Sequence, residues 1–187
     1  EIVSLEAKYF KQIIALGNKI HGSGYLTKAS ITAIDKKSRL NGTNCSFVVI
    51  DDDNVVGFRL TYAPTNWTLD QWCSPQLWKF PIEQLCYFKS STVDSEYRCR
   101  GIAKQMLKAS INVVKQQGGK GGICHTWMQS PNNAAYLYFI KSGGQYLKTH
   151  PNRWFDDGQS GYQCIVCGLD GPCHCDAAEM VLYFDEN

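Results

Sequence analysis

Apolar residues that recur every three to four positions predict two helices near the start of the chain. A short strand at residues 2–5 precedes the first helix, which Ser4 is expected to cap. This helix is predicted to end at Gly22. The second is predicted to begin near Thr27 and to stop at the turn residues 41–42. The inward-facing residues of the two helices are Tyr9, Phe10, Ile13, Ile14, Leu16, Ile20, Ile31, Ile34 and Leu40.

Runs of β-branched and aromatic residues predict the strands. Two of them flank the polar residues 51–54, which have the length and composition of a hairpin turn, so we expect an antiparallel pair and no chemical role for the aspartates there. A later run leads into a helix that begins after Ala103 and is stopped by the glycines of residues 118–122. The predicted strands are residues 46–50, 55–60, 85–93, 123–128, 145–148 and 179–184.

The composition fits a single domain over residues 1–187. Of the 187 residues, 44% are apolar, which is enough for one ordinary core. The chain carries 19 lysines and arginines against 17 acidic residues, a net charge of +2, which is too balanced to indicate nucleic-acid binding. No apolar run approaches the ~20 residues that span a bilayer, and the start lacks the pattern of an export signal. We therefore expect no membrane association and a cytoplasmic location.

The turn between the strand at residues 85–93 and the following helix is rich in positive charge and small residues. A helix N-terminus has backbone N–H groups without partners and the positive end of the helix dipole, so it binds anions, phosphates above all. Gly101 lets a phosphate approach the backbone, and Arg98, Arg100 and Lys104 surround the same turn. The pattern suits a pyrophosphate, although taken alone it also fits a solvated turn.

Two motifs in order resemble the GNAT superfamily of N-acetyltransferases. The pattern Arg98-x-x-Gly101-x-Ala103 is similar to that family's acetyl-CoA pyrophosphate loop, with Cys99 where the family very often has glycine. Residues 132–144 are similar to a later helical motif of the family. Its positions fall on Asn132, Ala135, Tyr138, Phe139, Lys141 and Gly143.

The resemblance implies an α/β (α+β) fold with a mixed, mostly antiparallel central sheet flanked by helices. In that fold, two parallel strands splay apart at the cofactor site, and the pantetheine arm of acetyl-CoA bonds to the exposed strand backbone. The two early helices flank the acceptor. The residues that the resemblance assigns to the cofactor are Ser91, Thr92, Val93, Arg98, Cys99, Arg100, Gly101, Ile102, Ala103, Lys104 and Asn132.

The implied reaction is transfer of an acetyl group from acetyl-CoA to a primary amine of a small molecule or peptide, by direct attack in a ternary complex. The family commonly uses a tyrosine to protonate the departing thiolate, and Phe139 occupies that position here. Because losing a general acid costs only about 10²- to 10⁴-fold in rate, we expect a working enzyme. The catalytic candidate is Tyr138, with water or an acceptor hydroxyl as the other proton source. His125 lies in a predicted strand, where we expect a packed or surface residue.

A cysteine cluster interrupts the last part of the chain. Cys164 and Cys167 form a C-x-x-C motif, and Cys173 and Cys175 follow after a Gly-Pro turn. Four thiolates satisfy the tetrahedral preference of zinc and leave no open position, so we predict a structural zinc, with His174 as a reserve ligand. Disulfides or four small buried side chains are the alternatives. The cluster lies in a predicted insertion at about residues 149–178, which a metal would fix.

Two other functions remain open at this point: a catalytically inactive acyl-CoA binder, and a zinc-bearing module that docks protein or nucleic acid. The second lacks a basic stripe. The proline- and tryptophan-rich residues 63–84 form either one wall of an acceptor pocket or a flap over the core. The oligomeric state is expected to be a monomer or a homodimer.

Overall fold

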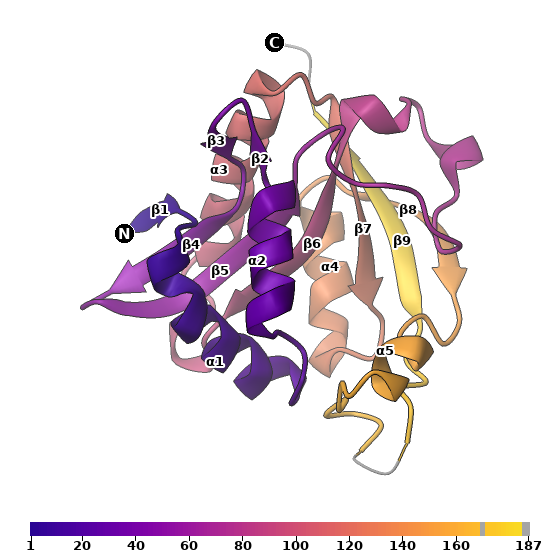
Figure 1. Ribbon diagram of the computed structural model, residues 1–187. Helices are drawn as coiled ribbons and strands as arrows, with labels where there is room; N and C mark the ends of the chain where they lie inside the picture. Colours follow the sequence, from indigo (N-terminus) through magenta and orange to yellow (C-terminus); the bar gives the residue numbers. More distant parts are fainter. Residues whose placement is uncertain (169–170, 185–187) are drawn as a thin grey trace.

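A computed structural model describes residues 1–168 and 171–184, and within these residues seven strands form one sheet (Figure 1). The strand order is β1-β4-β5-β6-β7-β9-β8. Residues 169–170 of the predicted insertion and residues 185–187 of the predicted domain lie outside the described residues. The strands are β1 (Ile2–Ser4), β4 (Phe47–Asp51), β5 (Asn54–Tyr62), β6 (Leu85–Val93), β7 (Gly121–Trp127), β8 (Gln145–His150) and β9 (Ala177–Tyr183).

One strand pair differs from the rest of the sheet. β6 and β7 run parallel, whereas the other neighbouring strands are antiparallel. Their pairing covers only Leu85–Tyr87 on β6 and residues 121–123 on β7. Beyond Tyr87 the two strands separate, and the rest of β6 pairs with β5 alone within the described sheet. The mixed, mostly antiparallel sheet with a splayed parallel pair is the predicted fold class, which is confirmed.

A β-bulge lies on β6 just after the point of separation. Leu60 of β5 pairs with Ser90, and Thr61 pairs with Phe88, so Lys89 is an extra residue on β6. A bulge bends the strand and changes the direction of its side chains, and bulges are common beside functional sites. Here the bulge leaves Lys89 without a partner in the register of β5.

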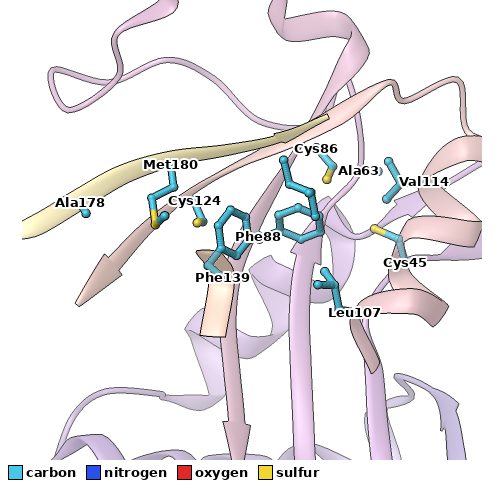
Figure 2. Packing of buried hydrophobic residues seen from close by; sticks show 11 residues of the cluster. Cys45, Ala63, Cys86, Phe88, Leu107, Val114, Cys124, Phe139, Ala178 and Met180 are labelled. Atoms are coloured by element: carbon cyan, nitrogen blue, oxygen red, sulfur yellow. The ribbon is translucent and has the colours of Figure 1, made fainter. Parts of the chain in front are cut away.

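Helices cover both faces of the sheet (Figure 1). α1 (Phe10–His21) and α2 (Lys28–Lys37) lie in front of the sheet in this view, and α3 (Ile102–Gln116) and α4 (Ala134–Lys141) lie behind it. Phe58 of β5 packs in the cluster formed with α1 and α2. Phe88 and Phe139 pack in the cluster that contains α3 and α4 residues, with ring centroids 6.0 Å apart (Figure 2).

The early helices agree with the prediction in part. Thr27 caps α2, and its side chain accepts a hydrogen bond from the Ser30 backbone N–H. The prediction that Ser4 caps the first helix is wrong, because Ser4 ends β1 and a 3₁₀ turn, Ala7–Tyr9, precedes α1. The predicted end of the second helix at residues 41–42 is also wrong.

The second helix ends early because a small hairpin follows it. α2 ends at Lys37, and β2 (Arg39–Leu40) pairs with β3 (Thr43–Asn44). The residues between these two strands, Asn41 and Gly42, both have positive φ, 51° and 81°. Asn-Gly with positive φ at both residues is a preferred two-residue hairpin turn, and here that preference overrides its other use as a helix stop.

The aromatic segment of residues 63–84 is anchored to the sheet by a buried carboxylate. Glu179 on β9 is fully buried, and its Oε1 accepts hydrogen bonds from the Ser74 backbone N–H and the Trp78 indole N–H, each at 2.9 Å. Its Oε2 lies 2.8 Å from Nε2 of His150. Trp67 packs with Leu85 and the neighbouring strands. The segment therefore covers apolar sheet surface, as the flap alternative predicts.

Candidate active site

A large cavity lies where β6 and β7 separate. It has a volume of about 950 Å³ and passes from the N-terminus of α3 to the residues around the point of separation. None of residues 63–84, all of which the structure describes, lines it. Its walls come from α1, α2, β5, β6, β7, the start of α3, α4 and the segment that contains α5 (Phe155–Gln159).

The predicted phosphate turn forms one end of this cavity. Gly101 is the N-cap of α3 with φ 74°, and the neighbouring Cys99 also has positive φ. Arg98 and Lys104 line the cavity, whereas Arg100 donates a hydrogen bond to the carbonyl oxygen of Glu96 at 3.0 Å and does not line it. The predicted cofactor residues that line the cavity are Ser91, Thr92, Val93, Arg98, Cys99, Gly101, Ile102, Ala103 and Lys104.

The remaining predicted cofactor residue, Asn132, does not line the cavity. It belongs to a 3₁₀ turn, Pro131–Asn133, and has a left-handed backbone with φ 57°. Asn133 has φ 53° and is the N-cap of α4. This turn sets the start of α4 and thereby determines which of the helix's residues face α3.

Tyr138 on α4 points its hydroxyl group at the start of α3. The hydroxyl donates a hydrogen bond to the Ala103 carbonyl oxygen at 2.9 Å and accepts one from a terminal guanidinium nitrogen of Arg59 at 3.2 Å. Phe139 is 3% exposed and packs against Phe88 in the core (Figure 2). The hydroxyl that the sequence predicts to be catalytic therefore lies at the cavity wall, and the phenylalanine beside it has a packing role.

A tyrosine–histidine pair occupies the point of strand separation. The Tyr87 hydroxyl lies 2.9 Å from Nδ1 of His125, and Nε2 of His125 lies 2.6 Å from the Trp72 carbonyl oxygen. Because a carbonyl only accepts, Nε2 carries the hydrogen, and Nδ1 accepts the hydrogen bond that Tyr87 donates. Burial lowers the pKa of His125 to about 4 and raises that of Tyr87 well above its usual value.

The sequence analysis set His125 aside, although both members of this pair line the cavity. The signal that could have found them is cross-strand register. Tyr87 is aligned with Ile123, and His125 follows Ile123 by two residues, so its side chain is on the same face of the parallel pair. That argument needs the strand register, which the sequence alone does not supply.

The four clustered cysteines lie close enough to bind one metal ion. The sulfur atoms of Cys164, Cys167, Cys173 and Cys175 all lie within 4.8 Å of one another. The sulfur–sulfur distance is 3.8 Å between Cys164 and Cys175, 4.0 Å between Cys167 and Cys173, and 3.5 Å between Cys167 and Cys175. A tetrahedron with Zn–S bonds of about 2.3 Å has edges of about 3.8 Å, whereas a disulfide is about 2.05 Å long. The donor set therefore fits a tetrahedral metal and contradicts the disulfide alternative.

The predicted reserve ligand, His174, is directed elsewhere. Its Nδ1 lies 3.1 Å from the side-chain oxygen of Asn152, and its backbone N–H donates to the sulfur of Cys167 at 3.3 Å. His174 thus supports the cluster through its backbone.

The segment around the cysteine cluster forms one wall of the cavity. Trp154, Tyr162 and Cys173 line it. The segment also contacts the C-terminal end of α1, because the Tyr162 hydroxyl donates to the His21 carbonyl oxygen at 3.0 Å. Whatever fixes the four sulfurs therefore also fixes the position of this wall.

Positive charge predominates around the end of the cavity opposite the phosphate turn. Lys37, Lys89 and Arg153 line this end, together with the acidic Asp157. Arg153 lies 3.9 Å from Asp157 and 3.6 Å from Asp70. Lys37 and Lys89 form no ion pair with any residue of the described ranges.

Comparisons with known proteins agree with this geometry. The sequence matches the Acetyltransferase (GNAT) family over residues 10–143. The fold is similar to Ard1 from Thermoplasma volcanium, with a TM-score of 0.70 and 14% identity over 100% of this chain and 98% of that chain. The fold is also similar to that of yncA from Salmonella typhimurium, solved with its cofactor acetyl-CoA. The TM-score is 0.65 and the sequence identity is 14%, over 100% of this chain and 95% of that chain. A third similar structure is Arabidopsis thaliana Naa50 in complex with the bisubstrate analogue CoA-Ac-MVNAL. Its TM-score is 0.64 and its sequence identity is 15%, over 98% of each chain. A search of curated proteins gave no match.

The chain therefore belongs to the GNAT family of acetyltransferases, since the family match covers more than half of it. The match confirms the resemblance that the sequence motifs indicate. It ends at residue 143, before the cysteine-containing segment begins. Across the described parts of the chain, no helix is both long enough and apolar enough to cross a membrane.

The phosphate turn gives the first testable prediction. Gly101→Asp adds a side chain at φ 74° and places a negative charge where the pyrophosphate is expected. We expect CoA binding to weaken at least ~10-fold, because charge-assisted contacts of about 1.5–3 kcal/mol are lost. Calorimetric titration of CoA measures this. The matched control is Gly118→Asp, which also has positive φ but lies outside the cavity. Equal CoA affinity of Gly101→Asp and the parent contradicts the location.

Proposed function

We propose that this protein is an N-acetyltransferase that transfers an acetyl group from acetyl-CoA to a primary amine in a ternary complex. The observation that carries this proposal is the single cavity that joins the phosphate turn of α3 to the Tyr87–His125 pair. In this proposal the pyrophosphate binds at the Gly101 turn. The pantetheine arm runs beside Ser91–Val93 and adds to the strand edge that β7 leaves unpaired.

The Tyr87–His125 pair supports a route for the proton of the attacking amine. As the amine nitrogen bonds to the thioester carbonyl carbon, its proton passes to the Tyr87 oxygen, and the tyrosine proton passes to Nδ1 of His125. His125 is free to accept this proton because its tautomer leaves Nδ1 as the acceptor, and the lowered pKa makes the imidazolium a short-lived form that gives the proton up again. The Trp72 carbonyl, which already bonds Nε2–H, stabilises the imidazolium that forms.

The leaving group departs at the other side of the same cavity. When the C–S bond breaks, the electron pair stays on the CoA sulfur, and the resulting thiolate takes a proton from the Tyr138 hydroxyl or from water. Tyr138 reaches this position from α4, next to the start of α3. To donate its proton it must exchange its hydrogen bond with Ala103 for one with the sulfur.

The proton route predicts the effect of two conservative substitutions. Tyr87→Phe and His125→Gln are each expected to lower kcat by about 10²- to 10⁴-fold while CoA affinity stays within about twofold of the parent. CoA release in the presence of a broad amine panel measures turnover. Tyr146→Phe is the matched control, because Tyr146 is exposed and outside the cavity. A parent that binds CoA but turns over no amine in the panel supports the inactive acyl-CoA binder instead.

The charge of the cavity supports an acceptor that carries an anionic group near its amine. Lys37 and Lys89 lie at the acceptor end without carboxylate partners among the described residues. The Lys37 ammonium group lies 5.0 Å from the ring centroid of Tyr62, which stacks on Tyr87. Lys89, the extra residue of the β6 bulge, also lines the cavity. A carboxylate bound between the two lysines would lie close to the reacting amine.

This acceptor proposal predicts a charge-dependent preference. The parent is expected to acetylate amino acids and acidic peptides with a lower KM than their amides, and to disfavour polyamines. Lys89→Met is expected to raise KM for the carboxylate acceptors about tenfold and to leave KM for the amides unchanged, because one charge-assisted contact of about 1.5 kcal/mol is lost. Lys148→Met, an exposed strand lysine outside the cavity, is the control. Equal KM values for acids and amides in the parent contradict the proposal.

We also propose that the cysteine cluster holds a structural zinc ion. The sulfur–sulfur distances and the burial of Cys164, Cys173 and Cys175 support a closed site, in which all four positions are occupied by protein. The zinc takes no part in the reaction. It fixes the wall that carries Trp154 and Tyr162, and so maintains the acceptor end of the cavity.

Metal analysis tests the zinc directly. The purified protein is expected to contain one zinc ion per chain, and Cys167→Ser is expected to lose it and to lower Tm by roughly 5 °C or more, since 1 kcal/mol shifts Tm by about 2–4 °C in a chain of this size. Cys73→Ser, which alters a cysteine outside the cluster, is expected to keep the metal. A metal-free parent with unchanged Tm and activity excludes the structural role.

A further inference from the structure

One arginine in the core has no counter-ion within the described residues. Arg59 on β5 is 2% exposed, and no carboxylate of residues 1–168 or 171–184 lies within ion-pair distance of it. Its Nε has no hydrogen-bond partner. Its contacts are the Tyr138 hydroxyl at 3.2 Å and the ring of Phe88, whose centroid lies 5.1 Å from the guanidinium carbon. A buried charge without a partner is strongly unfavourable, so the site is incomplete without an anion.

The anion must come from what the cavity binds. Arg59 lines the cavity itself, together with Tyr138 and Phe88. The thiols near it are neutral, because burial raises the pKa of both Cys86 and Cys124. Neither cysteine therefore provides a negative charge that could balance the guanidinium group of Arg59.

We propose that Arg59 stabilises the CoA thiolate that forms when the C–S bond breaks. This inference rests on the proposed function, in which the sulfur departs beside Tyr138. Acetyl-CoA has no charge at its thioester, so the negative charge appears on sulfur only as the electron pair of the C–S bond moves there. Arg59 transfers no proton in this step, and the proton that later neutralises the thiolate comes from Tyr138 or water. A cation that gains its partner only during the reaction lowers the barrier and does not tighten binding of the substrate.

The position of Arg59 favours the thiolate over the pyrophosphate. The pyrophosphate is expected at the Gly101 turn, where Arg98 and Lys104 already supply positive charge. Arg59 lies on the opposite side of the Tyr138 hydroxyl, which stands between it and the Ala103 carbonyl. Tyr138 and Arg59 thus form a pair in which the arginine donates to the hydroxyl oxygen, and the hydroxyl proton, which bonds to the Ala103 carbonyl, changes partner to reach the sulfur.

The test uses CoA itself and needs no acceptor. CoA and desulfo-CoA, which lacks the thiol, are titrated into the protein at pH 7.5 in two buffers with different ionisation enthalpies, which gives the number of protons released on binding. A charge-assisted contact of this kind favours the ionised thiol about 10- to 100-fold, so a free thiol with a pKa near 8.5 becomes mostly ionised when bound. The parent is expected to release roughly half a proton or more per CoA and none per desulfo-CoA.

Three variants make the test specific to Arg59. Arg59→Met keeps an apolar side chain of similar length in the core and is expected to abolish proton release with CoA while binding desulfo-CoA as the parent does. Arg59→Lys is expected to restore part of the release. Arg39→Met removes an exposed arginine outside the cavity and is expected to leave the proton release and both affinities unchanged. Equal affinity for desulfo-CoA shows that the Arg59→Met protein is folded at the cofactor site.

The outcomes separate this inference from the proposed function. Proton release that persists in Arg59→Met overturns the thiolate assignment while leaving the cofactor site intact. Tighter binding of succinyl-CoA than acetyl-CoA that disappears in Arg59→Met also overturns it, because the anion is then a carboxylate of the acyl group. A parent that binds neither CoA nor desulfo-CoA contradicts the proposed cofactor site and this inference with it.

Discussion

The early end of the β6–β7 pairing is the constraint on which the active site depends. Only three residue pairs join the two parallel strands, from Leu85 to Tyr87 on β6. Beyond them, the backbone groups on the edge of β6 away from β5 need another hydrogen-bond partner, because an unpaired buried polar group is unfavourable. The exposed edge of β6 can therefore accept an extended ligand. The same separation opens the cavity, places Tyr87 and His125 at its inner end, and lets α4 approach the start of α3 from behind the sheet.

One segment outside the matched family region completes this cavity. The segment with the cysteine cluster supplies one wall, and its position relative to α1 is set by the hydrogen bond from Tyr162 to His21. A long connection between two strands is entropically costly to order, and a metal held by four sulfurs offsets much of that cost. In the proposed function this segment forms the acceptor end of the site, and a metal bound by the four cysteines would stabilise it.

The sequence predicted local features well and long-range contacts poorly. The strand Leu85–Val93 was found within its observed bounds, and the Gly101 turn lies at the start of α3, because both depend on residues adjacent in sequence. The hairpin around Asn41 and Gly42 was missed because Asn-Gly ends helices as well as turning hairpins. The Tyr87–His125 and Arg59–Tyr138 contacts join residues 38 and 79 positions apart, so only the strand register and the packing of α4 on α3 reveal them.

The contact between His125 and the Trp72 carbonyl has a consequence for how this site tolerates sequence change. A main-chain oxygen fixes the histidine tautomer, so the side chain at position 72 has no part in that hydrogen bond. The oxygen is positioned by the path of the segment, which Glu179 secures through the Ser74 N–H and the Trp78 indole N–H. Residue 72 is therefore free to vary as far as the tautomer is concerned, whereas a change at the fully buried Glu179 reaches His125 by two routes: through the backbone of residues 72–78, and through His150, whose ring centroid lies 5.5 Å from that of His125.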